Sequence, residues 1–293
     1  TIHPVAGTGM FANAWWMIAA PLLVAAILLI GVGMLDAWGH YLAVAAIWFS
    51  FAVGACLFAE MWGRPVAERV VESHLYDWFS VGAWSFPVGL LVDPLSIVFV
   101  LLITGVGGLI HIYSIGYMAH DPRRRRFFAY LNLFVAAMLT LVLADSYLIL
   151  FVGWEGVGLA SYLLISFWQE RPSAAAAGVK AFVMNRIGDV GMVLAISSML
   201  AMFGSVRFVD VSAGAAALEP MWATLIGIFL LVGACGKSAQ VPLQAWLLDA
   251  MEGPTPVSAL IHAATMVTAG VYLVVRSHAI FEASPVAQMA VVI

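Results

Sequence analysis

Long apolar segments recur along the whole chain, and this recurrence constrains the fold more than any other feature. A membrane-spanning helix needs about 20 mostly apolar residues to cross roughly 30 Å of hydrocarbon. Eight segments reach that length, with expected ranges 14–35, 41–62, 93–115, 127–144, 146–168, 174–203, 221–251 and 256–276. A ninth apolar segment begins near residue 285. The sequence therefore predicts an all-α, polytopic bundle of membrane helices.

The composition excludes a soluble domain. The chain is 64% hydrophobic and 10% charged, with a mean hydropathy of +1.03, whereas soluble domains are about 45–50% apolar and about 25% charged. We expect the lipid bilayer as the surroundings, and the net charge of -4 gives no sign of a nucleic-acid partner. Cys56 and Cys235 lie in separate apolar segments, so no metal, haem or iron–sulfur site is predicted from them.

The distribution of polar residues divides the chain into three expected parts. Residues 1–92 comprise two N-terminal spans and a more polar extramembrane loop at about 63–92, for which a hairpin is one possible form. Residues 93–280 form the core, and residues 281–293 begin a further helix. Because the chain starts with Thr1 and stops inside an apolar segment, we expect it to be a fragment of a longer protein.

Basic residues predict which way the bundle is oriented. Cytoplasmic loops carry an excess of Lys and Arg, and four consecutive arginines occupy 123–126. With this loop cytoplasmic, Arg171 and Lys180 fall on the same side, which gives six basic residues against four on the other, Arg64, Arg69, Arg207 and Arg276. The N-terminus is then predicted to be external.

The seventh segment is too long for one uninterrupted span and contains helix breakers. Glycines precede Lys237 and Pro242 follows it, so we expect a break at 236–242. Irregular backbone survives in a membrane only where it faces protein or water, and interrupted helices in transporters mark the transport site. The Gly-Pro-Thr-Pro run at 253–256 should end this segment, with Thr255 capping the eighth helix and Pro256 at its first position.

Lys237 is the strongest candidate for a functional residue. A lysine at bilayer depth costs roughly 2.5–3.5 kcal/mol on insertion scales. Desolvation lowers the pKa of a lysine and a nearby carboxylate raises it again, so a Lys–Glu pair whose separation changes can load and release a proton. The alternative is a lysine that only caps the broken helix.

Three further ionisable residues lie deep in the fifth and sixth segments. Glu155 is about nine residues into its span, roughly 14 Å deep, among three glycines that permit close helix approach. It is expected to pair with and tune a buried base, or else to anchor two helices together. Arg186 and Asp189 are three residues apart and are expected to form an intrahelical ion pair, with a role in proton transfer or a static one.

His262 is the candidate relay in the eighth segment. Its unperturbed pKa near 6.5 suits proton transfer, and Ser258, Thr265 and Thr268 add polar groups around it. The alternative is a hydrogen-bonded core histidine. Two other residues are expected to be positional: Lys180 extends toward the helix end, and His111 lies at the membrane interface.

Several of these segments resemble subunit L of bacterial respiratory complex I, the proton-pumping NADH–quinone oxidoreductase. The resemblance covers about residues 90–280 and rests on 92–96, 127–134, Gly-Trp-Glu-Gly-Val-Gly at 153–158, Asn-Arg-Ile-Gly-Asp at 185–189, 236–240 and above all 253–272. This family is related to Mrp-type sodium/proton antiporters, whose large subunit shares the same core. It implies an antiporter-like bundle with a discontinuous seventh helix and a first half-channel within 93–280.

The resemblance also implies roles for the candidate residues. Lys237 would be the pumping lysine, Glu155 its modulator and His262 the link toward the central hydrophilic axis, with Asp189 and Arg186 in the polar network of the sixth span. The chain would bind no cofactor, while NADH, FMN, Fe–S clusters and quinone would belong to partner subunits. An adjacent antiporter-like subunit and a location in the bacterial inner (plasma) membrane are likewise implied. The alternatives are an Mrp-type antiporter and a scaffold whose charges only hold helices together.

Overall fold

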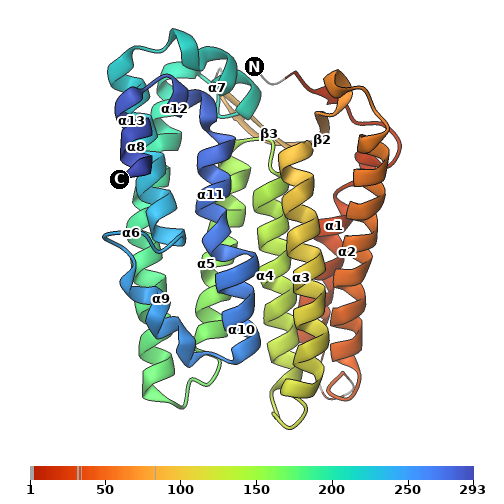
Figure 1. Cartoon of the computed structure of the whole chain (residues 1–293). Coiled ribbons are helices and arrows are strands. Elements are labelled where there is room, and N and C mark those ends of the chain that lie inside the picture. The colour runs from red at the N-terminus through yellow and green to blue at the C-terminus, as the bar shows by residue number, and fades with distance from the viewer. Residues whose placement is uncertain (1–2, 32, 34, 83) are drawn as a thin grey trace.

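The computed structural model describes residues 3–31, 33, 35–82 and 84–293, without the side chains of residues 263 and 264. Within this part, eight helices are long and apolar enough to cross a membrane, as the sequence predicts. They run side by side (Figure 1). The first six spans contain α1 (Trp16–Ile30), α2 (Gly39–Trp62), α3 (Pro94–Tyr117), α4 (Arg124–Leu143), α5 (Tyr147–Ile165) and α6 (Pro172–Phe203).

Helix ends follow local chemistry that the sequence encodes. Asp93 caps α3, where its carboxylate accepts a hydrogen bond from the Ser96 backbone N–H at 2.8 Å and the Ser96 hydroxyl accepts one from the Asp93 N–H. Ser146 caps α5 in the same way through its hydroxyl. Gly204 ends α6 with a left-handed φ of 67°. These caps fix where the spans begin and end.

Helix α4 lies at the centre of the bundle and contributes most to its core. About 78% of its membrane window is buried inside the protein, more than for any other span among the described residues. A Cβ added at Gly153 of α5 would lie 2.5 Å from the Leu141 backbone nitrogen of α4. The absence of a side chain there lets α4 and α5 approach closely, which holds α5 in a fixed position for the residues that follow it.

The seventh span is discontinuous, as predicted. Helix α8 (Pro220–Lys237) ends at Lys237, an irregular segment covers 238–244, and the chain turns helical again in α9 (Ala245–Asp249) and the 3₁₀ turn η4 (Ala250–Glu252). Ala239 has a left-handed φ of 51° inside the break. The Trp246 indole donates a hydrogen bond to the Gly236 carbonyl at 3.0 Å, so part of the opened backbone is satisfied by protein.

The eighth span is not the uninterrupted helix that the sequence predicts. It consists of α10 (Thr255–Ala259), a π-helical turn η5 (Leu260–Ala264) and α11 (Met266–Arg276). The predicted cap is also wrong, because α10 begins at Thr255 itself and Pro254 occupies the N-cap position. The Thr255 hydroxyl instead lies 3.3 Å from the Tyr117 hydroxyl of α3. Apolar length predicts the span, but it cannot predict a wider turn inside it.

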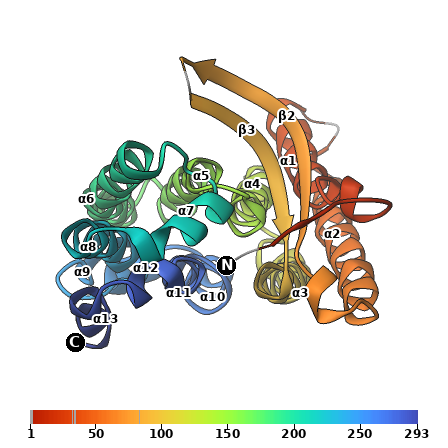
Figure 2. The same cartoon turned by 90° about the horizontal axis from the view of Figure 1, so that it is seen from above.

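A small layer of extramembrane structure covers one end of the bundle, here called the hairpin end. Strands β2 (Val71–Val81) and β3 (Trp84–Val92) pair antiparallel, and β1 (Val5–Ala6) pairs parallel with β2. Figure 2 shows this hairpin extending past the helices. The same layer contains α7 (Phe208–Gly214) and α12 (His278–Glu282), and α13 (Pro285–Val292) follows. Short 3₁₀ turns complete the chain: η1 (Phe11–Asn13), η2 (Val66–Glu68) and η3 (Ala215–Ala217).

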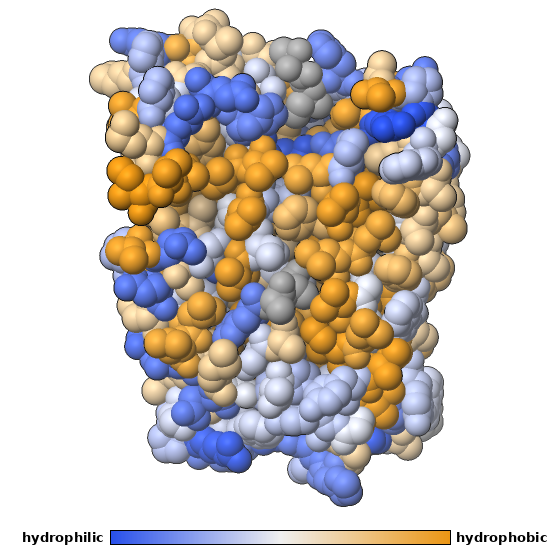
Figure 3. All heavy atoms as spheres, in the orientation of Figure 1, coloured by the Kyte–Doolittle hydropathy of each residue, from blue (hydrophilic) through white to orange (hydrophobic). Residues whose placement is uncertain are grey.

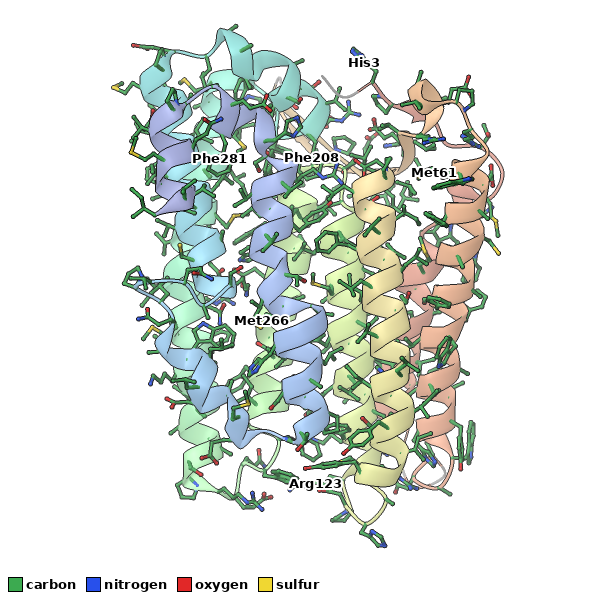
Figure 4. The ribbon with its side chains drawn as sticks, viewed as in Figure 1. His3, Met61, Arg123, Phe208, Met266 and Phe281 are labelled. Atoms are coloured by element: carbon green, nitrogen blue, oxygen red, sulfur yellow. The ribbon has the colours of Figure 1, made fainter. Side chains whose placement is uncertain are left out.

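The surface agrees with a bundle that spans a bilayer. Figure 3 shows an apolar band across the middle of one face, with hydrophilic groups gathered at both ends. Figure 4 places Arg123 at one end and Phe208 at the other, so the arginine run and the hairpin lie on opposite sides of the band. The end of the bundle at which Arg123 lies is here called the arginine end. The arrangement follows the alternation that the basic residues predict.

Candidate functional site

Lys237 lies in the last turn of α8 with none of its surface exposed. Among the described residues, its Nζ atom has no hydrogen-bond partner. It faces an aromatic ring, since Nζ lies 5.6 Å from the centroid of the Trp154 ring. A buried cation with this environment has a large desolvation cost, and the ring offsets only part of it.

Two features of α5 form the seat of this ammonium group. Trp154 is fully buried and presents its ring to Lys237. Gly158 lies one turn further along the same face, where an added Cβ would be 2.8 Å from the lysine Nζ. The glycine therefore leaves the room that the ammonium occupies, in addition to the smooth helix surface that the sequence predicts.

The indole of Trp154 also connects the lysine to α6. Its Nε1–H donates a hydrogen bond to Asp189 Oδ1 at 2.7 Å, and Asp189 is 5% exposed. The expected intrahelical pair between Arg186 and Asp189 is therefore wrong: Asp189 is held by a side chain of the neighbouring helix. Spacing of three residues places two groups on one face, but the rotation of that face toward α5 decides which partner each one meets.

Glu155 pairs with Arg186 across the same two helices, and Arg186 also lies 4.8 Å from the centroid of the Phe182 ring. The expected contact pair of Glu155 with Lys237 is thus replaced by an ion pair with arginine. Trp154 and Glu155 are adjacent in sequence but point about 100° apart around α5. The helix consequently directs one residue to the lysine and the next one to the arginine.

This network opens onto the outer face of α5 and α6. A hollow of about 500 Å³ is lined by charged residues and by Phe151, Val190, Val193 and Leu194. The Arg186 side chain is 49% exposed and that of Glu155 is 22% exposed. Charges at this depth are costly against lipid, so this face requires water or another protein segment. The site is therefore buried on the Lys237 side and accessible on the Arg186 side.

His262 lies in the π turn of the eighth span and is half-buried. Its Nε2 atom is buried and has no hydrogen-bond partner in the part of the chain that the structure describes. The hydroxyl groups of Thr265 and Thr268 donate to the carbonyls of Leu260 and Thr265, both at 2.7 Å. Figure 4 places Met266, which directly follows this turn, near mid-height in the bundle. The recorded contacts of His262 include none with Lys237, so a connection between them needs water.

Two positional predictions have different outcomes. Lys180 extends from α6 to Asp249 of α9, with 2.5 Å between Nζ and Oδ2, and both side chains are partly exposed. His111 is fully buried, with Nδ1 2.7 Å from the Gly107 carbonyl and Nε2 3.4 Å from the Asn132 amide nitrogen, and its position at the membrane interface stays a prediction. The sequence shows how far a residue is from a helix end, but not which neighbours cover it.

A second buried ion pair was missed by the sequence, which assigned Arg276 only to topology. Arg276 at the end of α11 donates to both carboxylate oxygens of Asp93, with 3.0 Å from Nη2 to Oδ1, and to the Tyr272 hydroxyl. Burial alone would raise the pKa of Asp93, but the guanidinium and the Ser96 hydrogen bonds outweigh it and hold the pKa below its usual value. The sequence does contain a signal for this pair. Asp93 is a helix-capping acid and Arg276 ends a span, and both span ends are expected on the same side of the membrane.

Tryptophan 154 was also missed, because its residue type fits lipid-facing or core packing equally well. Its position directly before Glu155 was the only available signal.

For metals, the described residues contain no group of three or more His, Cys, Asp or Glu placed to hold an ion. Cys56 and Cys235 are both free thiols.

Comparisons of the sequence with known families find two matching profiles. The sequence profile of a family described as NADH:quinone oxidoreductase/Mrp antiporter, TM, matches residues 144–293. A second profile, NADH-Ubiquinone oxidoreductase (complex I), chain 5 N-terminus, matches residues 78–128.

The chain is 59% identical over 279 residues to NADH-quinone oxidoreductase subunit L of Mycobacterium tuberculosis. The matched region covers 95% of this chain and 44% of that protein. The chain is 50% identical over 224 residues to the subunit L of Escherichia coli, covering 74% of this chain and 36% of that protein. The chain therefore spans less than half the length of these relatives.

Among solved structures, one chain of the Mrp complex from Dietzia sp. DQ12-45-1b superimposes with a TM-score of 0.78 at 28% identity. The superposition covers 94% of the present chain and 29% of the chain from the Mrp complex.

Proposed function

The chain belongs to the NADH:quinone oxidoreductase/Mrp antiporter transmembrane family, and from this membership we propose that it is the proton-translocating part of an L-type subunit of NADH–quinone oxidoreductase. The observation that carries the proposal is Lys237, a fully buried lysine at the break of a membrane helix. A lysine in this position can exchange a proton, whereas an arginine cannot. The chain itself performs no redox step, and its proton movement is driven by quinone reduction in other subunits.

In the proposed cycle, Lys237 accepts a proton through water from the arginine end, which is cytoplasmic. Carboxylates such as those of Asp189 and Glu155 favour the charged form of a nearby lysine, and a guanidinium such as that of Arg186 opposes it. When Glu155 pairs with Arg186, as it does in this structure, the lysine loses part of its stabilisation and its proton moves laterally through water toward His262. The half-buried π turn that carries His262 supplies the unpaired nitrogen for this step.

The proposal includes the surroundings of the chain. The charged hollow of Glu155, Arg186 and Asp189 would pack against the adjacent antiporter-like subunit, because this face cannot contact lipid without a large cost. NADH, FMN, Fe–S clusters and quinone would be bound by other subunits of the complex. The chain would cross the bacterial inner membrane several times with its N-terminus external.

Replacing the buried lysine tests this function. In the intact complex in proteoliposomes, Lys237→Ala should abolish coupled proton pumping, measured as protons moved per electron transferred to quinone. Lys180→Ala is the matched control, since this lysine is partly exposed and pairs with Asp249; it should pump at close to the wild-type ratio. A wild-type ratio in Lys237→Ala would refute the proposal.

The large subunit of an Mrp-type antiporter is the second candidate, favoured by the likeness to the Mrp complex of Dietzia. Purification of the chain with its native partners separates the two functions. Flavin and Fe–S proteins in the purified assembly support the redox-driven complex. Their replacement by small membrane subunits, with sodium/proton exchange in vesicles, would support the antiporter.

A further inference from the structure

The side chain of Trp154 contacts two groups of opposite charge, the Lys237 ammonium and the Asp189 carboxylate. Its ring face lies 5.6 Å from the Lys237 Nζ, and its indole Nε1–H donates to Asp189 Oδ1 at 2.7 Å. The electron-rich face suits a cation, while the N–H suits a carboxylate. We propose that Trp154 is a positioning residue that holds Lys237 and Asp189 on separate parts of one indole, so that they do not form a direct ion pair. This inference rests on the proposed function of Lys237.

The local sequence builds this separation into α5. Trp154 and Gly158 occupy the same face one turn apart, and an added Cβ at Gly158 would lie 2.8 Å from the lysine Nζ. The ammonium therefore fits between a ring and a gap on one helix. Asp189 belongs to α6 and lies on the N–H side of the ring. Trp154 is fully buried, so packing fixes its ring in this orientation.

The separation matters because the two kinds of partner hold a proton differently. An aromatic face stabilises the charged lysine without competing for its hydrogens. A buried carboxylate in direct contact with the ammonium holds the charged form more strongly, since the two charges attract in a medium of low dielectric. By binding the carboxylate itself, the indole leaves Lys237 with intermediate stabilisation. The lysine can then be both protonated and deprotonated during turnover.

Other charges act on the same lysine. Asp189 and Arg186 on α6 and Glu155 on α5 are the charged side chains around it. Glu155 is occupied by Arg186 in an ion pair. The Asp189 carboxyl accepts the hydrogen bond from Trp154 and also lies within hydrogen-bonding reach of the Glu155 carboxyl. Asp189 is therefore the acid that would be released toward Lys237 if the indole N–H were removed.

The test is Trp154→Phe in the intact complex, reconstituted in proteoliposomes, with proton pumping and quinone reduction measured across pH. Phenylalanine keeps an aromatic face but lacks the N–H. Because Asp189 can then pair directly with Lys237, the pH optimum of pumping should move by about one unit toward alkaline pH. The protons moved per electron should fall at neutral pH.

Two further variants separate positioning from a general packing defect. The double variant Trp154→Phe/Asp189→Asn should keep the pH optimum of Asp189→Asn alone, because the released charge is absent. Trp48→Phe is the matched control: its indole nitrogen is buried without a hydrogen-bond partner in the described structure, and the pH profile should not change.

Each outcome is informative. An unshifted pH optimum in Trp154→Phe, or an equal shift in the Asp189→Asn background, would overturn the inference. If Trp154→Phe does not assemble, β-(3-benzothienyl)alanine at position 154 keeps a bicyclic aromatic ring without the N–H donor, and the same criterion applies to it. Normal pumping by Lys237→Ala would refute the proposed function itself, whereas an inactive Lys237→Ala beside an unshifted Trp154→Phe removes only the role of the indole.

Discussion

At the scale of single residues, the site is defined by how side chains share their partners. Lys237 contacts an aromatic ring, Asp189 accepts from the same indole, and Glu155 is held by Arg186. Charge is thus distributed over three helices, α5, α6 and α8, without a direct contact between the lysine and an acid. Small changes in these contacts should alter proton exchange more than they alter folding.

Gly158→Ala tests the space around the ammonium. The added Cβ would lie 2.8 Å from Lys237 Nζ, which is the far end of a flexible side chain. Overpacking of this kind costs about 1–3 kcal/mol, and we expect the lysine to be displaced while the protein still folds. The rate of pumping should fall by about tenfold, which corresponds to 1.4 kcal/mol.

Gly116→Ala is the matched control for this change, because a Cβ there would meet no atom within 4 Å. Both variants should assemble to wild-type levels, as judged by the amount of purified complex. Equal pumping rates in Gly158→Ala and Gly116→Ala would contradict the role assigned to the gap.

The sequence predicted which residues carry the site better than it predicted their partners. Lys237, Glu155 and Asp189 could be identified because ionisable groups in long apolar segments are rare and costly. Their pairing could not, since it depends on the rotation of α5 against α6. Trp154 escaped notice because tryptophan has many uses in a membrane protein, and only its contacts distinguish them.

At the scale of elements, interruptions are concentrated in the seventh and eighth spans. The break after α8 was predictable from Gly and Pro. The π turn η5 was not, because it arises from packing and from hydroxyl groups that satisfy the widened backbone, such as Thr265 to Leu260. Beyond this turn, α11 is anchored to α3 through Arg276 and Asp93. In the eighth span, the half formed by α11 is therefore fixed by an ion pair, and the π turn η5 separates it from α10.

Asp93→Asn tests that anchor. Asparagine remains a good helix cap, so the change removes the charge that faces Arg276 and keeps the capping function. Removing one partner of a buried ion pair costs about 3–5 kcal/mol, and the complex should lose activity at a clearly lower temperature. Ser96→Ala affects the capping box alone and should cost about 1 kcal/mol. Similar thermal inactivation of the two variants would contradict a main role for the ion pair.

At the scale of the whole molecule, polar groups lie at mid-depth and at both ends of the bundle. At the hairpin end, Glu72 of β2 pairs with Arg207, and Leu90 of β3 forms a bridge with Ala144 next to Asp145. Asp145 is 4% exposed, and its Oδ1 has no partner among the described residues. The hairpin is thus held on the bundle by a cluster that includes one poorly satisfied acid.

The pH dependence of stability should report on Asp145. Burial, and then the charge of Glu72, raise the pKa of this carboxyl. A raised folded-state pKa gives stability that is fully present below the unfolded-state pKa and is lost as pH rises through the folded-state value. As the pH rises from 3.8 through the folded-state pKa, the free energy of unfolding of the wild type should therefore fall relative to that of Asp145→Asn, by about 1.4 kcal/mol for each unit of pKa shift.

Asp210→Asn is the control for this measurement, since Asp210 lies on α7 and accepts a hydrogen bond from the exposed Ser205 hydroxyl. Its melting curve should follow that of the wild type across pH. A wild-type pH dependence in Asp145→Asn would assign the effect to other groups.

The position of Lys237 at the end of α8 has an electrical consequence. The last turn of a helix carries about half an elementary negative charge on its main-chain carbonyls, and Lys237 is the final residue of this helix. With the lysine protonated, the helix end then carries a net charge of about +0.5, and with the lysine neutral about −0.5. The unit alternates almost symmetrically about zero, so neither state leaves a full uncompensated charge inside the membrane.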